Sequence, residues 1–160
     1  TVLAQDTPII VIADPGKEVE AAMRLGRIGF DQILGYLEGG ALALQARPDL
    51  VRRIARMTVT ELAPALGSVQ PPVVLDVRGP GERASKHLAG SLHIPLNRLV
   101  RQLHMVPRDR HVVLQCAGGY RSAIAASILA QHGMTDIADL VGGLAAWEAA
   151  GLDRVVTMAS

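Results

Sequence analysis

Two runs of the chain are apolar without the alternation that marks a strand with one solvated face. Residues 72–77 read Pro-Val-Val-Leu-Asp-Val, and residues 111–115 form a second apolar run that leads into Cys116. Such runs predict strands that are buried on both faces, as in a parallel sheet between helices. Because helical segments alternate with strands along the rest of the chain, we expect an α/β fold: a doubly wound parallel sheet with helices on both faces.

Cap and turn signals divide residues 58–152 further, and Thr60 and Asn97 are suitable N-caps for two of the helices. The expected elements are a strand at 58–59, a helix from Thr60 to Leu66, strands at 73–77 and 91–94 with a short helix at 81–86 between them, and helices at 97–104 and 120–132. Active sites in such sheets lie beyond the carboxyl ends of the strands, where Asp76 and Cys116 fall.

The amino-terminal part of the chain repeats the carboxyl-terminal part. Residues 8–16 resemble 111–119, and Gly39-Gly40 match Gly142-Gly143 after a slip of one residue. Between them, Ala21, Ala22, Leu25, Gly29 and Ile33 match Ala125, Ala126, Leu129, Gly133 and Ile137 at a constant offset. A repeat at this distance indicates a duplicated unit. The first copy has Ala13 or Asp14 near the place of the cysteine, and it lacks the half that precedes the strand in the second copy.

We therefore expect four segments along the chain. Residues 1–45 are a partial, Cys-less copy of the unit, 46–57 a linker with a helix at 49–56, 58–152 the complete catalytic domain, and 153–160 a tail. Half a unit cannot close a core, so residues 1–45 should pack on residues 58–152 or on a second chain, which leaves a homodimer open. The linker helix would have a basic face of Arg52, Arg53 and Arg56, either solvated or docking an anion or a domain.

Composition narrows the classes of function. The 160 residues are 49% hydrophobic with a formal charge of +1, which fits a globular protein and gives no reason to expect nucleic acid as a partner. No apolar run reaches the ~18 residues that span a bilayer, no signal-peptide pattern opens the chain, and one cysteine fits a reducing compartment. We expect a cytoplasmic protein without a membrane partner, whose natural start lies upstream of Thr1 or was trimmed. The five histidines are scattered, so we expect no metal and no cofactor.

The single cysteine, Cys116, is the strongest candidate for chemistry. It stands between a strand and a helix, and Ala117, Gly118 and Gly119 form the loop that joins them. Glycines permit a tight curl that turns backbone N–H groups toward the sulfur, and the helix N-terminus and Arg121 add positive charge. These effects should lower the thiol pKa below the free value of about 8.5 and favour a reactive thiolate over a packing residue.

Four motifs in order resemble the rhodanese, or thiosulfate sulfurtransferase, family over residues 58–152. They are Leu75–Arg78 with Glu82, the segment His87–Leu96, the loop Cys116–Ser122 and the segment Leu140–Trp147. One departure is Lys86, where a Gly commonly precedes the His of the family motif. The form of the loop, preceded by a degenerate copy, also resembles the carboxyl-terminal part of proteins that fuse a metallo-β-lactamase-fold persulfide dioxygenase to rhodanese domains. That resemblance implies such a domain as an upstream partner, although no metal-ligand cluster of that hydrolase fold is present in the sequence.

The resemblance implies a rhodanese-like fold and sulfur transfer through a persulfide on Cys116. A donor such as thiosulfate gives up its outer sulfur, and cyanide or a thiol takes it away, so small sulfur-containing anions and thiols are the expected partners. In the loop, Arg121 is expected to hold the donor's anionic end or to brace the loop, Tyr120 to shape the entrance, and Ser122 to be a first-turn helix residue. Asp76, Arg78 and Glu82 are expected to brace the loop, with substrate contact as the alternative.

Two other functions stay open. Rhodanese-like folds also host phosphatases with a Cys-x5-Arg loop, and arsenate reductase is a related activity, but here only four residues separate Cys116 from Arg121. The shorter loop suits a sulfur atom better than a phosphate. A sulfur-relay or docking module of a larger persulfide-oxidising enzyme would share the Cys116 persulfide without turnover.

Overall fold

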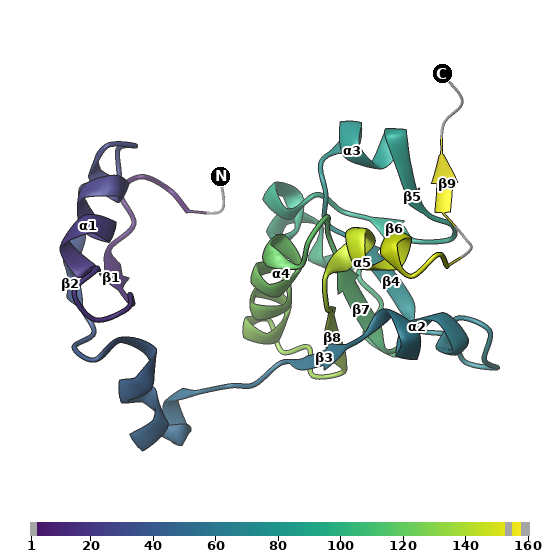
Figure 1. Cartoon of the computed structure of the whole chain (residues 1–160), viewed down its shortest axis with the longest axis horizontal. Coiled ribbons are helices and arrows are strands. Elements are labelled where there is room, and N and C mark those ends of the chain that lie inside the picture. Colours follow the sequence, from purple (N-terminus) through teal and green to yellow (C-terminus); the bar gives the residue numbers. More distant parts are fainter. Residues whose placement is uncertain (1–2, 153–154, 158–160) are drawn as a thin grey trace. The chain divides into compact units, whose positions relative to one another are not determined.

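The computed structural model of the chain describes residues 3–152 and 155–157. The chain divides into unit 1, from Thr1 to Arg53, and unit 2, from Ile54 to Ser160. Each unit is described by itself, and Figure 1 shows the elements of both. Within the described residues, no helix has the length and apolar character needed to cross a membrane.

A five-stranded sheet forms the centre of unit 2. Its spatial order is β3 (Ala55–Met57), β8 (Ile137–Leu140), β7 (Val112–Gln115), β4 (Val73–Asp76) and β6 (Leu92–His93), and all neighbours are parallel. The two apolar runs of the sequence are β4 and β7, which pair with each other inside the sheet, and every residue of β7 is buried. Their continuous apolar character follows from burial on both faces.

Helical segments cover both faces of this sheet (Figure 1). On one face, α4 (Tyr120–Gln131) and the 3-10 segments η3 (Leu96–Arg98) and η4 (Val100–Met105) share a core with Leu114. On the other face, α2 (Val59–Ala65) and α5 (Gly143–Ala149) bury Val113 and Trp147. Beyond β4 lie α3 (Pro80–Ser85) and β5 (Lys86–Leu88), which pairs antiparallel with β9 (Val155–Thr157). The expected α/β fold with a parallel sheet between helices is confirmed.

The strand expected at 58–59 is wrong, because the edge strand is β3 and residue 58 already caps a helix. Thr58, rather than Thr60, is the N-cap of α2. The Thr58 hydroxyl accepts from the Glu61 N–H at 3.3 Å, and the Glu61 carboxylate accepts from the Thr58 N–H at 2.7 Å. This capping box satisfies two N–H groups at once, which a cap at Thr60 without such a partner would not do.

The linker helix expected at 49–56 is also wrong. Only Pro48–Leu50 form a single 3-10 turn, η2, and the next regular element is the strand β3. β3 pairs in parallel with β8, and Ile54 packs on the core of unit 2, so sheet pairing and burial outweigh the local helical pattern. The helix expected at 97–104 is instead the two 3-10 segments η3 and η4, with a kink at Gln102.

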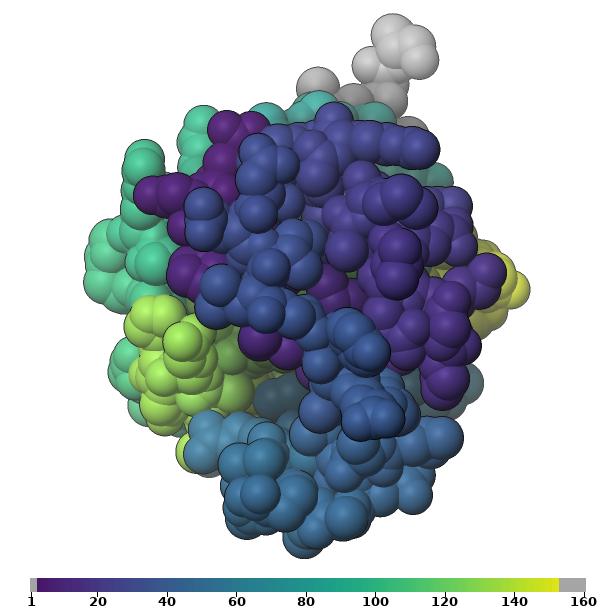
Figure 2. All heavy atoms as spheres, turned by 90° about the vertical axis from the view of Figure 1, so that its left-hand side faces the viewer, coloured from purple at the N-terminus to yellow at the C-terminus, as the bar shows by residue number. Residues whose placement is uncertain are grey.

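Unit 1 is a strand–helix–strand motif. β1 (Ile9–Val11) and β2 (Ile33–Tyr36) pair in parallel, α1 (Glu18–Gly26) connects them, and η1 (Gly40–Ala46) follows. Figure 2 draws the atoms of this unit in purple to blue. Its order of elements is that of β7, α4 and β8 in unit 2, followed by a helical segment after a Gly-Gly pair. The partial repeat expected over residues 1–45 stays a prediction.

Candidate active site

The sulfur of Cys116 lies in a loop that joins β7 to α4. Gly119 has φ +98°, a left-handed conformation that a glycine adopts without strain, and it is the N-cap of α4. This turn lets the Gly119 N–H donate to the sulfur, Sγ, at 3.1 Å. The Ser122 hydroxyl lies 3.5 Å from the same sulfur. Cys116 is only 1% exposed, so the thiol is held inside the loop rather than on its surface.

The loop is fastened to the start of α5 through its backbone. The Leu144 N–H donates to the Cys116 carbonyl at 2.8 Å, and the Ala145 N–H donates to the Ala117 carbonyl at 3.0 Å. Gly143 has φ +55°, and a side chain there would collide with the Cys116 carbonyl oxygen. The Gly-Gly pair before α5 therefore permits the close approach that positions the cysteine.

Two opposing effects act on the pKa of the Cys116 thiol. Burial raises the pKa, since the thiolate loses contact with water. The Ser122 hydroxyl and the N–H groups of Ser122, Gly119 and Gly118 lower it by hydrogen bonding to the thiolate, and together they outweigh burial. The net pKa is lowered, in the direction expected from the sequence. Ser122, expected to be only a helix residue, is thus a direct contact of the sulfur.

Arg121 is paired with Glu82 across the site. Its Nη1 and Nη2 donate to both carboxylate oxygens of Glu82, at 2.6 and 2.7 Å. The Arg121 hydrogen bonds lower the pKa of Glu82 to about 2, with a smaller contribution from the Gly79 N–H. This bidentate pair links α4 to α3, and a bracing role for Arg121 stays a prediction. An anion-holding role for Arg121 also stays a prediction. For that role the Arg121 guanidinium would have to leave Glu82, or bind Glu82 and the anion together.

Asp76 and Arg78 form a second brace at the end of β4. Both are buried, with Asp76 0% and Arg78 2% exposed. The Arg78 guanidinium donates to the Asp76 carboxylate at 2.7 Å and to the Lys86 carbonyl at 2.8 Å. Arg83, which the sequence reasoning missed, reaches the same carboxylate at 3.5 Å and the Ser91 hydroxyl at 2.7 Å. Its position beside Glu82 in a charged segment was the only signal that could have singled it out.

A hollow of about 240 Å³ lies beside the loop at this edge of the sheet. Ala117 and the first residues of α5 form one side, and Arg78 and Glu82 form another. Lys86 Nζ and a Glu148 carboxylate oxygen pair at 2.6 Å on its rim. Tyr120 is 81% exposed at the start of α4, and its expected role in shaping an entrance stays a prediction. Because Ala117 directly follows Cys116 in the chain, the hollow adjoins the cysteine loop.

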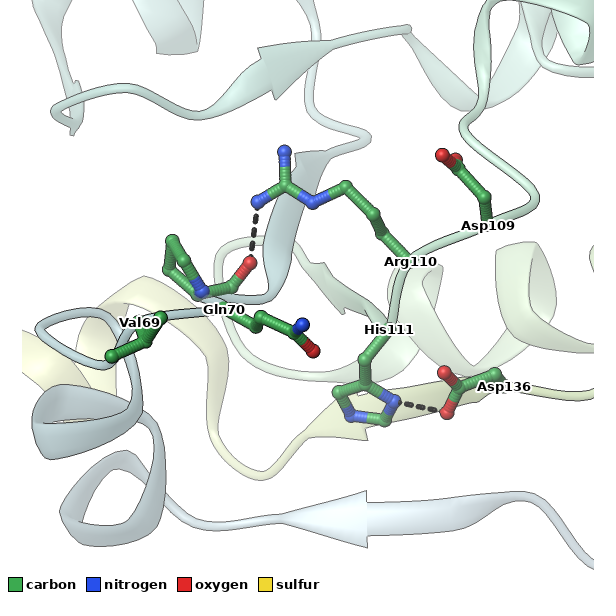
Figure 3. Close-up of a pocket in the computed structure, with 7 residues that line it drawn as sticks. Val69, Gln70, Asp109, Arg110, His111 and Asp136 are labelled. Carbon is green, nitrogen blue, oxygen red and sulfur yellow. Dashed lines mark hydrogen bonds and ion pairs between the residues drawn. The ribbon is translucent and has the colours of Figure 1, made fainter.

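A second hollow, of about 650 Å³, lies at the opposite end of the sheet, where β7 and β8 begin (Figure 3). His111 precedes β7 and Asp136 precedes β8, and their side chains point toward each other at 2.6 Å. The Arg110 guanidinium donates to the Pro71 carbonyl on another side of the hollow. Cys116 follows the carboxyl end of β7 and does not line this hollow. Among the described residues, no three His, Cys, Asp or Glu side chains gather as metal ligands would.

The family model for the rhodanese-like domain matches residues 58–150. The chain belongs to the rhodanese-like family. Among similar proteins, a sulfurtransferase of Allochromatium vinosum is 32% identical over 94 residues, which are 59% of this chain and 88% of that protein. The thiosulfate sulfurtransferase GlpE of Pseudoalteromonas translucida is 30% identical over 83 residues, covering 52% and 79% of the two chains.

A solved structure extends the likeness to the fold. A rhodanese-related protein from Thermoplasma volcanium is 32% identical, with a TM-score of 0.59 over 64% of this chain and 97% of that one. Two other relatives are matched over only 59% and 48% of their own lengths. The rhodanese-like chain thus resembles named sulfurtransferases at the level of the domain. The family model covers residues 58–150, and a metallo-β-lactamase-fold neighbour rests on the sequence resemblance only.

Proposed function

We propose that this rhodanese-like chain is a sulfurtransferase that carries sulfane sulfur on Cys116, from thiosulfate or a persulfide donor to a thiophilic acceptor. The observation that carries the proposal is the sulfur's cradle, in which the Gly119 N–H and the Ser122 hydroxyl converge on a thiol whose pKa is lowered. The names of the similar sulfurtransferases support the same reaction class.

The reaction proceeds in two half-reactions. The Cys116 thiolate attacks the outer sulfur of thiosulfate, a new S–S bond forms, and the old S–S bond breaks so that sulfite leaves with the electron pair. The negative charge then lies on the terminal sulfur of the persulfide, near the N–H groups that held the thiolate. Cyanide attacks that sulfur, thiocyanate leaves, and the thiolate is restored. No general base is needed if the thiolate is already formed.

The bracing pairs would act by holding the loop in place. The Arg121–Glu82 pair ties the loop to α3, and Asp76 with Arg78 fixes the segment that follows β4. The hollow beside Ala117, with Lys86 and Glu148 on its rim, offers both signs of charge to an approaching donor or acceptor.

A steady-state assay of thiosulfate with cyanide tests the proposal. We expect thiocyanate from the wild-type chain and none from Cys116→Ala, because the chain has no other cysteine. Activity that survives in Cys116→Ala would refute the proposal. Intact mass after thiosulfate alone should show a gain of about 32 Da, one sulfur, in the wild type only.

The alternative is a relay module, which would form the same persulfide without turnover with small acceptors. Cys116 is 1% exposed, so small acceptors have little access to its sulfur. This burial supports the relay alternative. A persulfide in the mass spectrum together with no thiocyanate would select it. Clear hydrolysis of an aryl phosphate would instead revive the phosphatase function.

A further inference from the structure

Unit 1 matches one half of unit 2 in detail. Gly39 and Gly40 have φ +76° and +59°, and their counterparts Gly142 and Gly143 have +72° and +55°. A side chain at Gly40 would collide with the carbonyl oxygen of Ala13, as one at Gly143 would with that of Cys116. Ala13 therefore occupies the position of Cys116, and β1 corresponds to β7.

The pairing of the strands gives the same correspondence. Ile10 pairs with Gly35 in unit 1, as Val113 pairs with Ala138 in unit 2. The register of β1 and β2 shifts between Ile9 and Ile10, which leaves Leu34 as one extra residue. That extra residue explains the slip of one residue between Ile33 and Gly39 in the sequence repeat.

The face of β1 that corresponds to a buried face of β7 is open. Ile10 and Ile12 are 58% and 54% exposed, while their counterparts Val113 and Gln115 are both 0% exposed. The extra residue of β2, Leu34, is 67% exposed. We call Ile10 and Ile12 the open face of unit 1. Ile10 lies in β1 and Ile12 directly follows it, and a covering partner would remove the free-energy cost of exposing these two apolar side chains.

One edge of β1 is open as well. Within the described residues, β1 pairs only with β2, whereas β7 lies between β8 and β4. In unit 2, the chain before β7 supplies the missing parts: β4 pairs with β7, and Leu62 and Leu88 help to cover Val113. The described residues before β1, 3–8, form no strand. An unpaired strand edge is a template for another strand, and a two-stranded sheet is marginally stable alone.

We infer that unit 1 is the carboxyl-terminal half of a second rhodanese-like unit, and that its open edge and open face bind an amino-terminal half of the same type. That partner is a polypeptide segment built like residues 54–111, with a strand parallel to β1 and apolar side chains over Ile10 and Ile12. The completed unit would have Ala13 in the position of the cysteine. It would therefore bind the amino-terminal half but could not transfer sulfur.

The test joins a second copy of residues 54–111, through a flexible linker, ahead of residue 1 of the full chain. Hydrogen exchange is then measured at the amides of Ile10 and Ile12. We expect exchange at least tenfold slower than in the 160-residue chain, and loss of this gain in Ile12→Asp. Val19→Asp, on the exposed side of α1, is the matched control and should keep the gain. Unchanged protection of α1 amides in both variants shows that unit 1 remains folded, and Ile12→Ser provides a milder variant if it does not.

Two results would overturn the inference. The first is no slowing in the joined chain. The second is full protection of these amides already in the 160-residue chain. If light scattering then shows a dimer, a second copy of the chain covers the open face. If it shows a monomer, unit 2 covers the open face. Thiosulfate–cyanide activity, which depends on Cys116, is expected to be the same in all these chains.

Discussion

Replacing Ser122 by alanine tests whether hydrogen bonding sets the pKa of the Cys116 thiol. Among the groups that lower this pKa against the effect of burial, the Ser122 hydroxyl comes first. A hydrogen bond to a charged group contributes about 1.5–3 kcal/mol, and one pKa unit corresponds to about 1.4 kcal/mol. Because the oxygen–sulfur distance is long, at 3.5 Å, we use the lower value. Ser122→Ala should therefore raise the thiol pKa, and the loss of about 1.5 kcal/mol corresponds to roughly tenfold less thiolate at a pH below the pKa.

The assay is the rate of alkylation by iodoacetamide as a function of pH, followed by intact mass. The chain has one cysteine, so the reaction has no background from other thiols. The thiolate reacts, so the rate rises with pH and levels off above the pKa; Ser122→Ala should move this midpoint to higher pH. Below both midpoints the variant should react about tenfold more slowly.

Ser127→Ala is the matched control on the same helix. Its exposed hydroxyl donates to the Ala123 carbonyl at 3.2 Å and should leave the midpoint unchanged. An unmoved midpoint in Ser122→Ala, or an equal shift in Ser127→Ala, would refute the reasoning. The lowered pKa would then have to come from the backbone N–H groups alone.

Three further predictions concern the two ion pairs beside the loop and the contact between the loop and α5. Because Arg121 lowers the pKa of Glu82 from 4.5 to about 2, the pair should stabilise the wild type above pH 4.5 and lose this effect as the pH falls toward 2. Glu82→Gln should abolish that loss in urea unfolding and cost about 1 kcal/mol at pH 7, a value reduced because both side chains are partly exposed. Asp76→Asn leaves the buried Arg78 without its carboxylate and should lower the unfolding free energy by about 3–5 kcal/mol in the same measurement. Gly143→Ala should displace the Cys116 carbonyl and lower the rate of thiocyanate formation at least tenfold.

Each of these variants has a control within the chain. Asp49→Asn breaks an exposed ion pair with Arg47 and should change stability by less than about 0.5 kcal/mol. Gly133→Ala meets the same kind of backbone strain, at φ +82°, but its side chain would enter open space. If Gly133→Ala slowed the reaction as much as Gly143→Ala, the effect would not come from the collision with the cysteine loop.

The buried strands and the cysteine loop could be predicted because each is encoded in a short segment. The apolar runs at β4 and β7 can be recognised without knowledge of a distant partner, and Gly119 predicts the turn that follows Cys116. The prediction of a linker helix at 49–56 was wrong for the opposite reason. Its local pattern was helical, but Ala55–Met57 pair with β8, more than 80 residues away in the chain.

The site divides in the same way. Cys116 and its loop are adjacent in sequence, so the lowered pKa could be anticipated from local geometry. The partners of Arg121 and Arg78 could not, because Glu82 and Lys86 lie on segments whose position depends on the whole sheet. Arg83 and Ser91 were missed for this reason, and the role of Ser122 was underestimated because its direction on the helix was unknown.

The sequence alone thus determined the fold class, and it predicted a reactive Cys116 and an incomplete repeat, since all three depend on local patterns and their order. Only the tertiary structure decided which groups contact the sulfur, which charges pair, and which face of unit 1 is left open. The physical reason is that hydrogen bonds and ion pairs act over a few ångströms in space, between residues that the sheet brings together from distant parts of the chain.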